Sequence, residues 1–283
     1  MKTLFVSVDF SKSSSAALRL AMSLAAESGN KLIVFHCYSI PTMVLAQLNN
    51  EDALNKLVAE TEEARLQFLL RYVHKYYKRA GKDIIPPNVT CMVSFNNMPA
   101  ETIVEMASHH RAALLIMGTH GLTGLKKILF GSTTATTIRD AGMPVLAVPE
   151  NYRRKRISNI CLASDLVNIE KELKLVNSIG HFTKAPVSIL HMQYVQAKSE
   201  PFIGHCKEIL RKRQNEAVKL VVKKADISKK LIEQIQKEAT GKKFDCLAMC
   251  PHEKGFWSKI LLGSKTEDIS ASIKIPLLSF KMS

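Results

Sequence analysis

The stretch Met117-Gly118-Thr119-His120-Gly121, followed after nine residues by Gly131-Ser132-Thr133, is the most informative part of this chain. It comes directly after the apolar run at 112–116. Because glycine has no Cβ, its backbone can approach a ligand closely and adopt φ values that other residues resist. A Gly-Ser pair at the start of a helix presents free N–H groups and a hydroxyl to an anion. The stretch therefore predicts a phosphate-binding loop between a strand and a helix.

The same stretch occurs a second time in altered form. It reads Met249-Cys250-Pro251-His252-Glu253 and, after nine residues, Gly263-Ser264-Lys265. Cys250 and Glu253 stand where the first copy has its two early glycines. A Cβ hinders close backbone approach, and a carboxylate repels a phosphate. We therefore expect the second copy not to bind phosphate in the manner of the first.

Other landmarks repeat in the same order along the whole chain. Asp9 and Asp165 each end an apolar run, and so do His36 and His191. A two-copy repeat of this length indicates two similar domains rather than a solenoid of short units. The 283 residues suit domains at 1–150 and 151–283, joined by a short basic connector without a Gly/Ser-rich linker. We expect the two domains to pack against each other.

Strands and helices are predicted to alternate in both copies. In the first copy the expected strands are 4–8, 31–36, 89–95, 112–117 and 145–148, with helices at 16–26, about 51–79, from 98 onward and 132–141. In the second copy the expected strands are 160–163, 187–191, 218–222, 247–249 and 277–280. This order predicts an α/β fold with two similar, open, mostly parallel five-stranded sheets that carry helices on both faces, as in a Rossmann-like fold.

The two closing strands, 145–148 and 277–280, are short and apolar. If they pair with each other, they cover both sheet edges and make the chain an internal pseudo-dimer. Ligands of open α/β sheets bind at the carboxyl ends of the strands. Asp9, the residues after His36 and the Gly118 loop all lie at such ends, which predicts a single site in the first copy. His36 and His191 themselves are interpreted as strand-end packing residues.

Composition limits the location and the chemistry of the protein. No window has the roughly 18 apolar residues of a membrane span, and the first strand reaches Asp9 too early for a signal peptide. We therefore expect a cytoplasmic protein without membrane partners. Cys37, Cys91, Cys161 and Cys246 lie in or beside apolar runs and are interpreted as small buried residues. Cys246, Cys250 and His252 leave a metal site open as an alternative, although their spacing matches no zinc signature.

Charge is distributed unevenly between the two copies. Residues 1–150 hold 15 Lys+Arg and 12 Asp+Glu, a net charge of +3, whereas residues 151–283 hold 25 and 13, a net charge of +12. A basic half can attract nucleic acid or an acidic partner. Its lysines are scattered, however, and no aromatic residues are interleaved to stack bases. A solvated basic surface is the preferred interpretation, and nucleic acid is not expected as a partner.

At these residues the chain resembles the universal stress proteins, as a tandem of two family domains. The family's ATP-binding signature is matched in full by Gly118, Gly121, Gly131 and Ser132. The strand ending at Asp9, the Asn97–Glu101 helix start and the closing Met143–Val148 strand also match. The resemblance covers nearly all of the first copy, and it covers the framework of the second copy without its full motif.

The resemblance implies a stress-response or regulatory protein that binds ATP, or ADP or AMP, with or without Mg²⁺. Asp9 matches the acidic residue that contacts the adenosine moiety, and Cys37 matches the position whose backbone reads the adenine edge. The resemblance and the loop together place these residues around the phosphates: Met117, Gly118, His120, Gly121, Gly131, Ser132 and Thr133. Lys126 and Lys127 lie in the same loop and can screen phosphate charge.

Neither catalytic residues nor metal ligands are assigned. No general base, nucleophile or carboxylate pair for phosphoryl transfer stands beside the loop, so at most weak ATP hydrolysis is expected. Two alternatives stay open. One is a slow ATPase or autokinase with Ser132 or Thr133 as phosphoacceptor, and the other is a basic adaptor that acts through residues 151–283. A homodimer and an unknown regulatory protein also stay open as partners.

Overall fold

The computed structural model describes residues 1–48, 50–120, 130–194, 196–212, 218–241, 244–250 and 274–281. Gly121, Lys126 and Lys127 of the first motif lie outside these described residues. So do the residues of the second motif that follow Cys250. None of the described helices combines the length and the hydropathy that a membrane span requires.

The first half of the chain forms a five-stranded parallel arrangement in the order β3-β2-β1-β4-β5. Its strands are β1 (Thr3–Ser7), β2 (Lys31–Tyr38), β3 (Val89–Phe95), β4 (Ala112–Gly118) and β5 (Val145–Val148). Its helices are α1 (Lys12–Ser28), α2 (Thr42–Leu45), α3 (Glu51–Arg79), α4 (Pro99–His109) and α5 (Ser132–Asp140). The alternation of strands and helices that the sequence predicts is therefore confirmed.

The second half repeats this arrangement in the order β8-β7-β6-β9-β10. Its strands are β6 (Ile160–Ala163), β7 (Val187–Gln193), β8 (Lys219–Lys224), β9 (Cys246–Met249) and β10 (Leu277–Ser279). Its helices are α6 (Ile169–Ser178), α7 (Gly180–Thr183), α8 (Gln196–Lys212) and α9 (Leu231–Gly241). β7 extends two residues beyond its predicted end, and β8 begins one residue later than predicted and ends two residues later.

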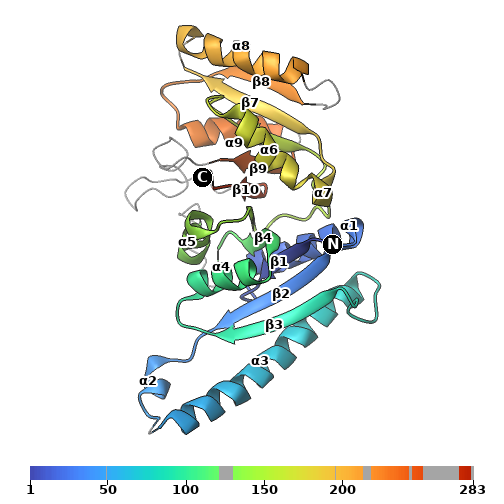
Figure 1. Ribbon diagram of the computed structural model, residues 1–283, viewed down its shortest axis with the longest axis vertical. Coiled ribbons are helices and arrows are strands. Elements are labelled where there is room, and N and C mark those ends of the chain that lie inside the picture. Colours follow the sequence, from blue (N-terminus) through green and yellow to red (C-terminus); the bar gives the residue numbers. More distant parts are fainter. Residues whose placement is uncertain are drawn as a thin grey trace.

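The closing strands of the two halves pair with each other. β10 runs antiparallel to β5, with Leu278 opposite Leu146, whereas the other pairings between described strands are parallel. The two five-stranded sheets are thus one continuous ten-stranded sheet, which Figure 1 shows as a stack from β8 to β3. Leu146 and Leu278, which lie opposite each other at this junction, are fully buried. The predicted pairing of the closing strands is confirmed, and it removes two open sheet edges.

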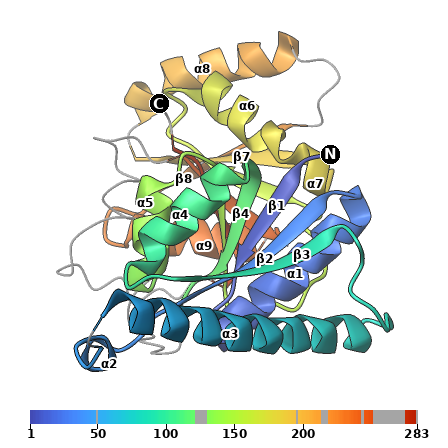
Figure 2. The same ribbon diagram turned by 60° about the horizontal axis from the view of Figure 1, so that its bottom comes forward.

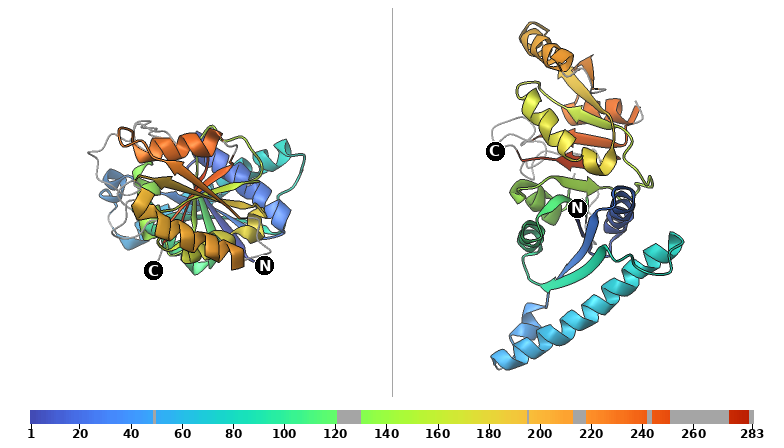
Figure 3. Two further views of the ribbon diagram at one scale, coloured as in Figure 1. Left: turned by 90° about the horizontal axis from the view of Figure 1, so that it is seen from above. Right: turned by 45° about the vertical axis from the view of Figure 1, so that its right-hand side comes forward.

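Helices cover both faces of this sheet and divide the core into two layers. The layer on one face includes side chains of α1, α3, α6, α7 and α8, and the layer on the other face includes side chains of α4, α5 and α9. Figure 3 shows α1 and α4 on opposite sides of the first half of the sheet. Because successive residues of a strand face opposite sides, the strands contribute to both layers.

Local sequence explains where the main helices begin and end. Ser11 caps α1 by accepting a 3.1 Å hydrogen bond from Ser14 N, and Gly29 ends the helix with φ +65°. Pro99 lies in the first turn of α4, where a missing N–H costs nothing. Asn50 caps α3, which runs from 51 to 79 as its apolar spacing predicts. This long helix lies along the β3 edge of the sheet (Figure 2).

The connector between the halves is anchored at several points. The Tyr152 side chain is buried and its hydroxyl donates a 3.0 Å hydrogen bond to the Arg156 carbonyl. Arg154 pairs with the buried Asp245, and Arg156 pairs with Glu27 of α1 at 3.2 Å. These contacts tie the connector to both halves, so the ten-stranded sheet is not held by β5 and β10 alone.

Tyr152→Phe is expected to lower the free energy of unfolding by about 1 kcal/mol, since it removes one hydrogen bond from a buried hydroxyl without changing the packing of the ring. Chemical denaturation followed by circular dichroism measures this loss. Tyr194→Phe, at a side chain that is 41% exposed, is the matched control and should change stability by less than about 0.5 kcal/mol. Equal effects of the two variants would contradict an anchoring role for Tyr152.

Three of the basic residues of the second half lie on the strand at the far edge of the sheet. β8 is an edge strand that carries Lys219, Lys223 and Lys224. Lys223 pairs with Glu238 at 3.5 Å. Lysines on an edge strand oppose pairing with further strands. This arrangement agrees with a solvated basic surface.

Candidate functional site

A pocket of about 240 Å³ opens at the carboxyl ends of β1, β2 and β4, between α4 and the first turn of α5. Eight of the nine predicted site residues line it: Asp9, Cys37, Met117, Gly118, His120, Gly131, Ser132 and Thr133. The ninth, Gly121, lies outside the described residues. The other lining residues were not among the predicted site residues, and they are Ser7, Val8, Ser14, Pro99, Ile103 and Thr134.

Asp9 is held in a tight turn at the end of β1. Its Oδ1 accepts a 3.0 Å hydrogen bond from Ser11 N, and its own N–H donates to Ser14 Oγ at 3.3 Å. Phe10 between them has φ +64°, which is uncommon for a bulky residue and marks local backbone strain. The ring of Phe10 packs against His36, with 4.5 Å between centroids, and this contact supports the strained conformation. The turn fixes the Asp9 carboxylate at the pocket.

His36 joins the ends of two strands rather than entering the pocket. Its side chain is buried, and Nδ1 lies 2.8 Å from the Val8 carbonyl, to which it donates. Burial is the main cause that lowers the pKa of His36, and the charge of Arg65 acts in the same direction. His191 repeats the arrangement, with Nδ1 3.0 Å from the Ser164 carbonyl. Both contacts agree with the predicted packing role.

Gly118 is required by the packing of β4 on α1. A Cβ at this position would lie 2.5 Å from Ser13 Oγ, 2.7 Å from Ser14 N and 2.8 Å from the Ser13 carbonyl carbon. Two of these neighbours are backbone atoms of the first turn of α1, so a rotamer change cannot relieve the contact. The sequence suggested a glycine that opens the way for a ligand. The structure adds a second reason for this glycine, the close approach of a helix.

The loop between β4 and α5 is anchored at both described ends. Before it, the His120 carbonyl accepts hydrogen bonds from Ser13 Oγ and, at 3.4 Å, from Ser11 Oγ. After it, Gly131 N donates to the Thr119 carbonyl at 2.9 Å, and Thr134 Oγ1 donates to the Gly118 carbonyl at 2.9 Å. These bonds hold the start of α5 beside the end of β4, which brings Ser132 and Thr133 to the pocket.

The first turn of α5 supplies the part of the site that suits an anion. Gly131 is the N-cap residue of α5 and has an extended conformation. As a glycine, it has no side chain with which to cap the helix. The first N–H groups of a helix have no partner within the helix, and the helix dipole adds positive potential there. Ser132 and Thr133 add hydroxyl groups at the pocket. An anionic group, such as a phosphate, is the ligand group that this end of the pocket fits.

Cys37 lines the opposite part of the pocket from β2. Its Sγ donates to the Asn96 carbonyl at 3.6 Å. Burial raises the pKa of the Cys37 thiol, and the hydrogen bonds to Thr102 and Asn96 oppose this only in part. The thiol is therefore protonated at neutral pH and is a poor nucleophile. Met117 packs in the core beneath the pocket, with 5% of its surface exposed.

The six cysteines carry free thiols. Cys161 and Cys246 are buried as predicted, Cys37 and Cys91 are half-buried, and Cys206 and Cys250 are also buried. In the described part of the chain, no group of three residues suits a metal ion, and His252 lies outside it. Burial raises the pKa of Cys250, helped by the charges of Glu172 and Asp165. Because His252 lies outside the described residues, the alternative of a metal site at Cys246, Cys250 and His252 stays a prediction.

Comparisons with known proteins agree with this fold. The model described as "Universal stress protein family" matches residues 1–149. A universal stress protein of Methanocaldococcus jannaschii is 29% identical over 163 residues, covering 52% of this chain and 94% of the relative. A universal stress protein of Thermus aquaticus is 26% identical over 147 residues, covering 52% and 98%.

A solved structure resembles the whole chain. The crystal structure of a universal stress protein from Archaeoglobus fulgidus matches with a TM-score of 0.67 and 16% identity, covering 99% of this chain and 98% of the other. At this identity the match shows the fold, and it does so for both halves.

Proposed function

Since the chain belongs to the universal stress protein family, we propose that its first half, residues 1–150, binds ATP or a related adenine nucleotide and that the protein acts in a stress response or in regulation. The observation that carries the proposal is the single pocket that joins Asp9 and Cys37 at one end to the first turn of α5 at the other. The first end offers a carboxylate to ribose hydroxyls or base N–H groups. The second end offers helix N–H groups to phosphate.

The described chemistry of the pocket supports binding rather than rapid turnover. Its titratable lining residues are Asp9, Cys37 and His120. The Asp9 carboxylate is proposed to accept hydrogen bonds from the nucleoside end of the ligand, and the Cys37 thiol is held protonated. His120 is tied to Thr119, with Nδ1 3.1 Å from Oγ1. We propose that nucleotide binding changes the assembly of the protein, in the cytoplasm and with a regulatory protein as partner.

Ser132→Glu is expected to weaken ATP binding at least about 10-fold, because it places a carboxylate where the phosphates would lie. Ser132 is exposed and begins α5, and a carboxylate in a first helical turn does not harm the helix. Titration calorimetry of ATP with Mg²⁺ into the intact chain measures the affinity and should give about one ATP per chain. This site is a better test than Gly118, whose substitution alters the packing of α1.

Ser108→Glu is the matched control, since Ser108 is exposed on α4 and does not line the pocket. It should bind ATP as the unmodified protein does. If Ser132→Glu and Ser108→Glu bind ATP equally well, the nucleotide does not occupy this pocket. If the unmodified chain binds no adenine nucleotide, the proposed function is wrong.

A further inference from the structure

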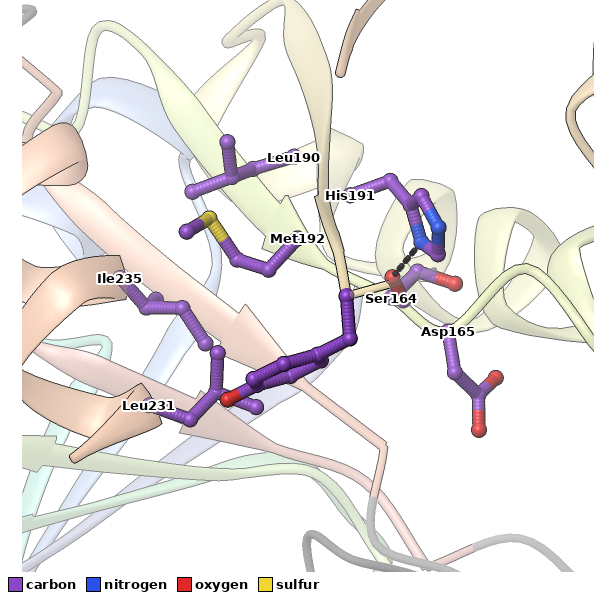
Figure 4. A pocket seen from close by; sticks show the side chains of 8 residues that line it. Ser164, Asp165, Leu190, His191, Met192, Leu231 and Ile235 are labelled. Carbon is purple, nitrogen blue, oxygen red and sulfur yellow. Dashed lines mark hydrogen bonds between the residues drawn. The ribbon is translucent and has the colours of Figure 1, made fainter. Parts of the chain in front are cut away.

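A second pocket, also of about 240 Å³, lies in the second half at the carboxyl ends of β6 and β7 beside α9. Figure 4 shows the side chains that line it. They are Ser164, Asp165, Leu190, His191, Met192, Tyr194, Leu231 and Ile235. By its place in the repeated fold it corresponds to the pocket of the first half, because β6, β7 and α9 correspond to β1, β2 and α4.

Both pockets contain an aspartate that is held in a strained turn at the end of a strand. Asp165 Oδ1 accepts a 3.0 Å hydrogen bond from Val167 N, as Asp9 does from Ser11 N. Leu166 has φ +69°. The turn that fixes a carboxylate at the mouth of the first pocket is therefore built a second time, although the loop motif that follows β9 differs in sequence.

The walls of the second pocket are apolar. Leu190 and Met192 of β7 gather with Leu231 and Ile235 of α9 on one side of the pocket, and Asp165 lies on the other side (Figure 4). An apolar cavity of about 150 Å³ is known to take a benzene molecule. A pocket of about 240 Å³ therefore has room for a two-ring body between β7 and α9. Burial of apolar surface drives such binding.

The electrostatics of this pocket favour a cation over an anion. None of the described residues that line it is a lysine or an arginine, and Asp165 supplies a carboxylate. A second carboxyl group, that of the buried Glu172, accepts a hydrogen bond from Ser164 Oγ next to Asp165. The charge of Asp165 contributes to raising the pKa of Glu172, so the two groups interact.

We propose that the pocket of the second half binds a compact aromatic molecule that carries a protonated amine. The ring would lie between β7 and α9, on Leu190, Met192 and Leu231, and the ammonium group would donate hydrogen bonds to Asp165. The carboxylate accepts from Val167 through Oδ1 and has further lone pairs for a ligand. The two halves would then bind ligands of opposite charge at corresponding places of one sheet.

Three probes with one ring system and different charge test this proposal: tryptamine, indole and indole-3-acetate. Ligand-observed NMR with the intact chain gives their affinities. Tryptamine should bind about 10-fold more tightly than indole, because a charge-assisted hydrogen bond adds to the same apolar contact. Indole-3-acetate should bind most weakly. Binding of all three with equal affinity, or of none at millimolar concentration, would overturn the proposal.

Two variants locate the site. Asp165→Asn keeps an oxygen for Val167 N but removes the charge, so tryptamine should lose its roughly 10-fold advantage over indole. Asp226→Asn is the matched control, because Asp226 Oδ1 accepts from Ser228 N at the same 3.0 Å in an exposed turn of the same half. If tryptamine keeps the same advantage in affinity over indole in both variants, the probe does not bind at Asp165. ATP binding should be unchanged in Asp165→Asn, which separates this test from that of the first pocket.

Discussion

Gly118→Ala is expected to lower the free energy of unfolding by about 3 kcal/mol. The added methyl group would lie within 2.8 Å of the Ser13 and Ser14 backbone, so α1 must move away from β4. The helix resists this movement because its N-terminus is capped by Ser11 and because Ser11 and Ser13 both bind the His120 carbonyl. Urea unfolding followed by circular dichroism measures the loss.

Gly142→Ala is the control for this prediction. A Cβ at Gly142 would have no neighbour within 4 Å, and the substitution should change stability by less than about 0.5 kcal/mol. If Gly118→Ala unfolds at the same urea concentration as the unmodified protein, the packing argument is wrong. A stable Gly118→Ala variant that loses only ATP binding would show instead that the glycine serves the ligand alone.

The alternation of strands and helices could be predicted because its signals are local. The apolar spacing of α3 gives its bounds from 51 to 79, and apolar runs give β3 and β5. The pairing of β5 with β10 was predicted from the resemblance to the universal stress proteins, which commonly pair through this strand, and pairing within one chain covers both edges. The predicted bounds of β7 and β8 were less accurate, and both strands end two residues later than predicted. Polar residues such as Gln193 and Lys224 continue these strands near a sheet edge, where a strand does not need to be apolar.

The residues around the first pocket could be predicted only in part. The glycine motif and the aspartate at the end of a strand are visible in the sequence, and the structure places both at one pocket. The contact of Gly118 with Ser13 was not predictable from pattern, because the two residues are far apart in the chain and meet only through the packing of α1 on β4. The ligand contacts of the site stay a prediction.

The second half contained a buried carboxyl group that the sequence did not reveal. Glu172 lies in the polar-looking stretch Ile169–Lys174, where a glutamate would usually face solvent. In the structure its side chain is fully buried on α6 and accepts a hydrogen bond from Ser164, which in turn accepts one from Leu166 N at 2.8 Å. Helical periodicity places Leu173 and Val176 on the buried face, and Glu172 lies beside them.

Glu172→Gln is expected to stabilise the protein at pH 8 by about 3 kcal/mol and to have little effect at pH 4. Burial is the main cause that raises the pKa of Glu172 to about 7, and the charge of Asp165 acts in the same direction against the opposing effect of the Ser164 hydrogen bond. A glutamate in the unfolded chain has a pKa of about 4.3. Between these two values the unfolded chain loses its proton while the folded protein keeps it, so stability falls as the pH rises.

The glutamine side chain has the same shape but cannot ionise, so the variant lacks this loss. The difference in the free energy of unfolding between Glu172→Gln and the unmodified protein should therefore grow from pH 4 to pH 7 and stay constant above. Urea unfolding at a series of pH values measures it, and Glu170→Gln, at an exposed glutamate of the same helix, is the control. A difference that does not depend on pH would mean that Glu172 ionises as readily in the folded protein as in the unfolded chain. The carboxyl group beside Asp165 would then be fully charged at neutral pH instead of partly protonated.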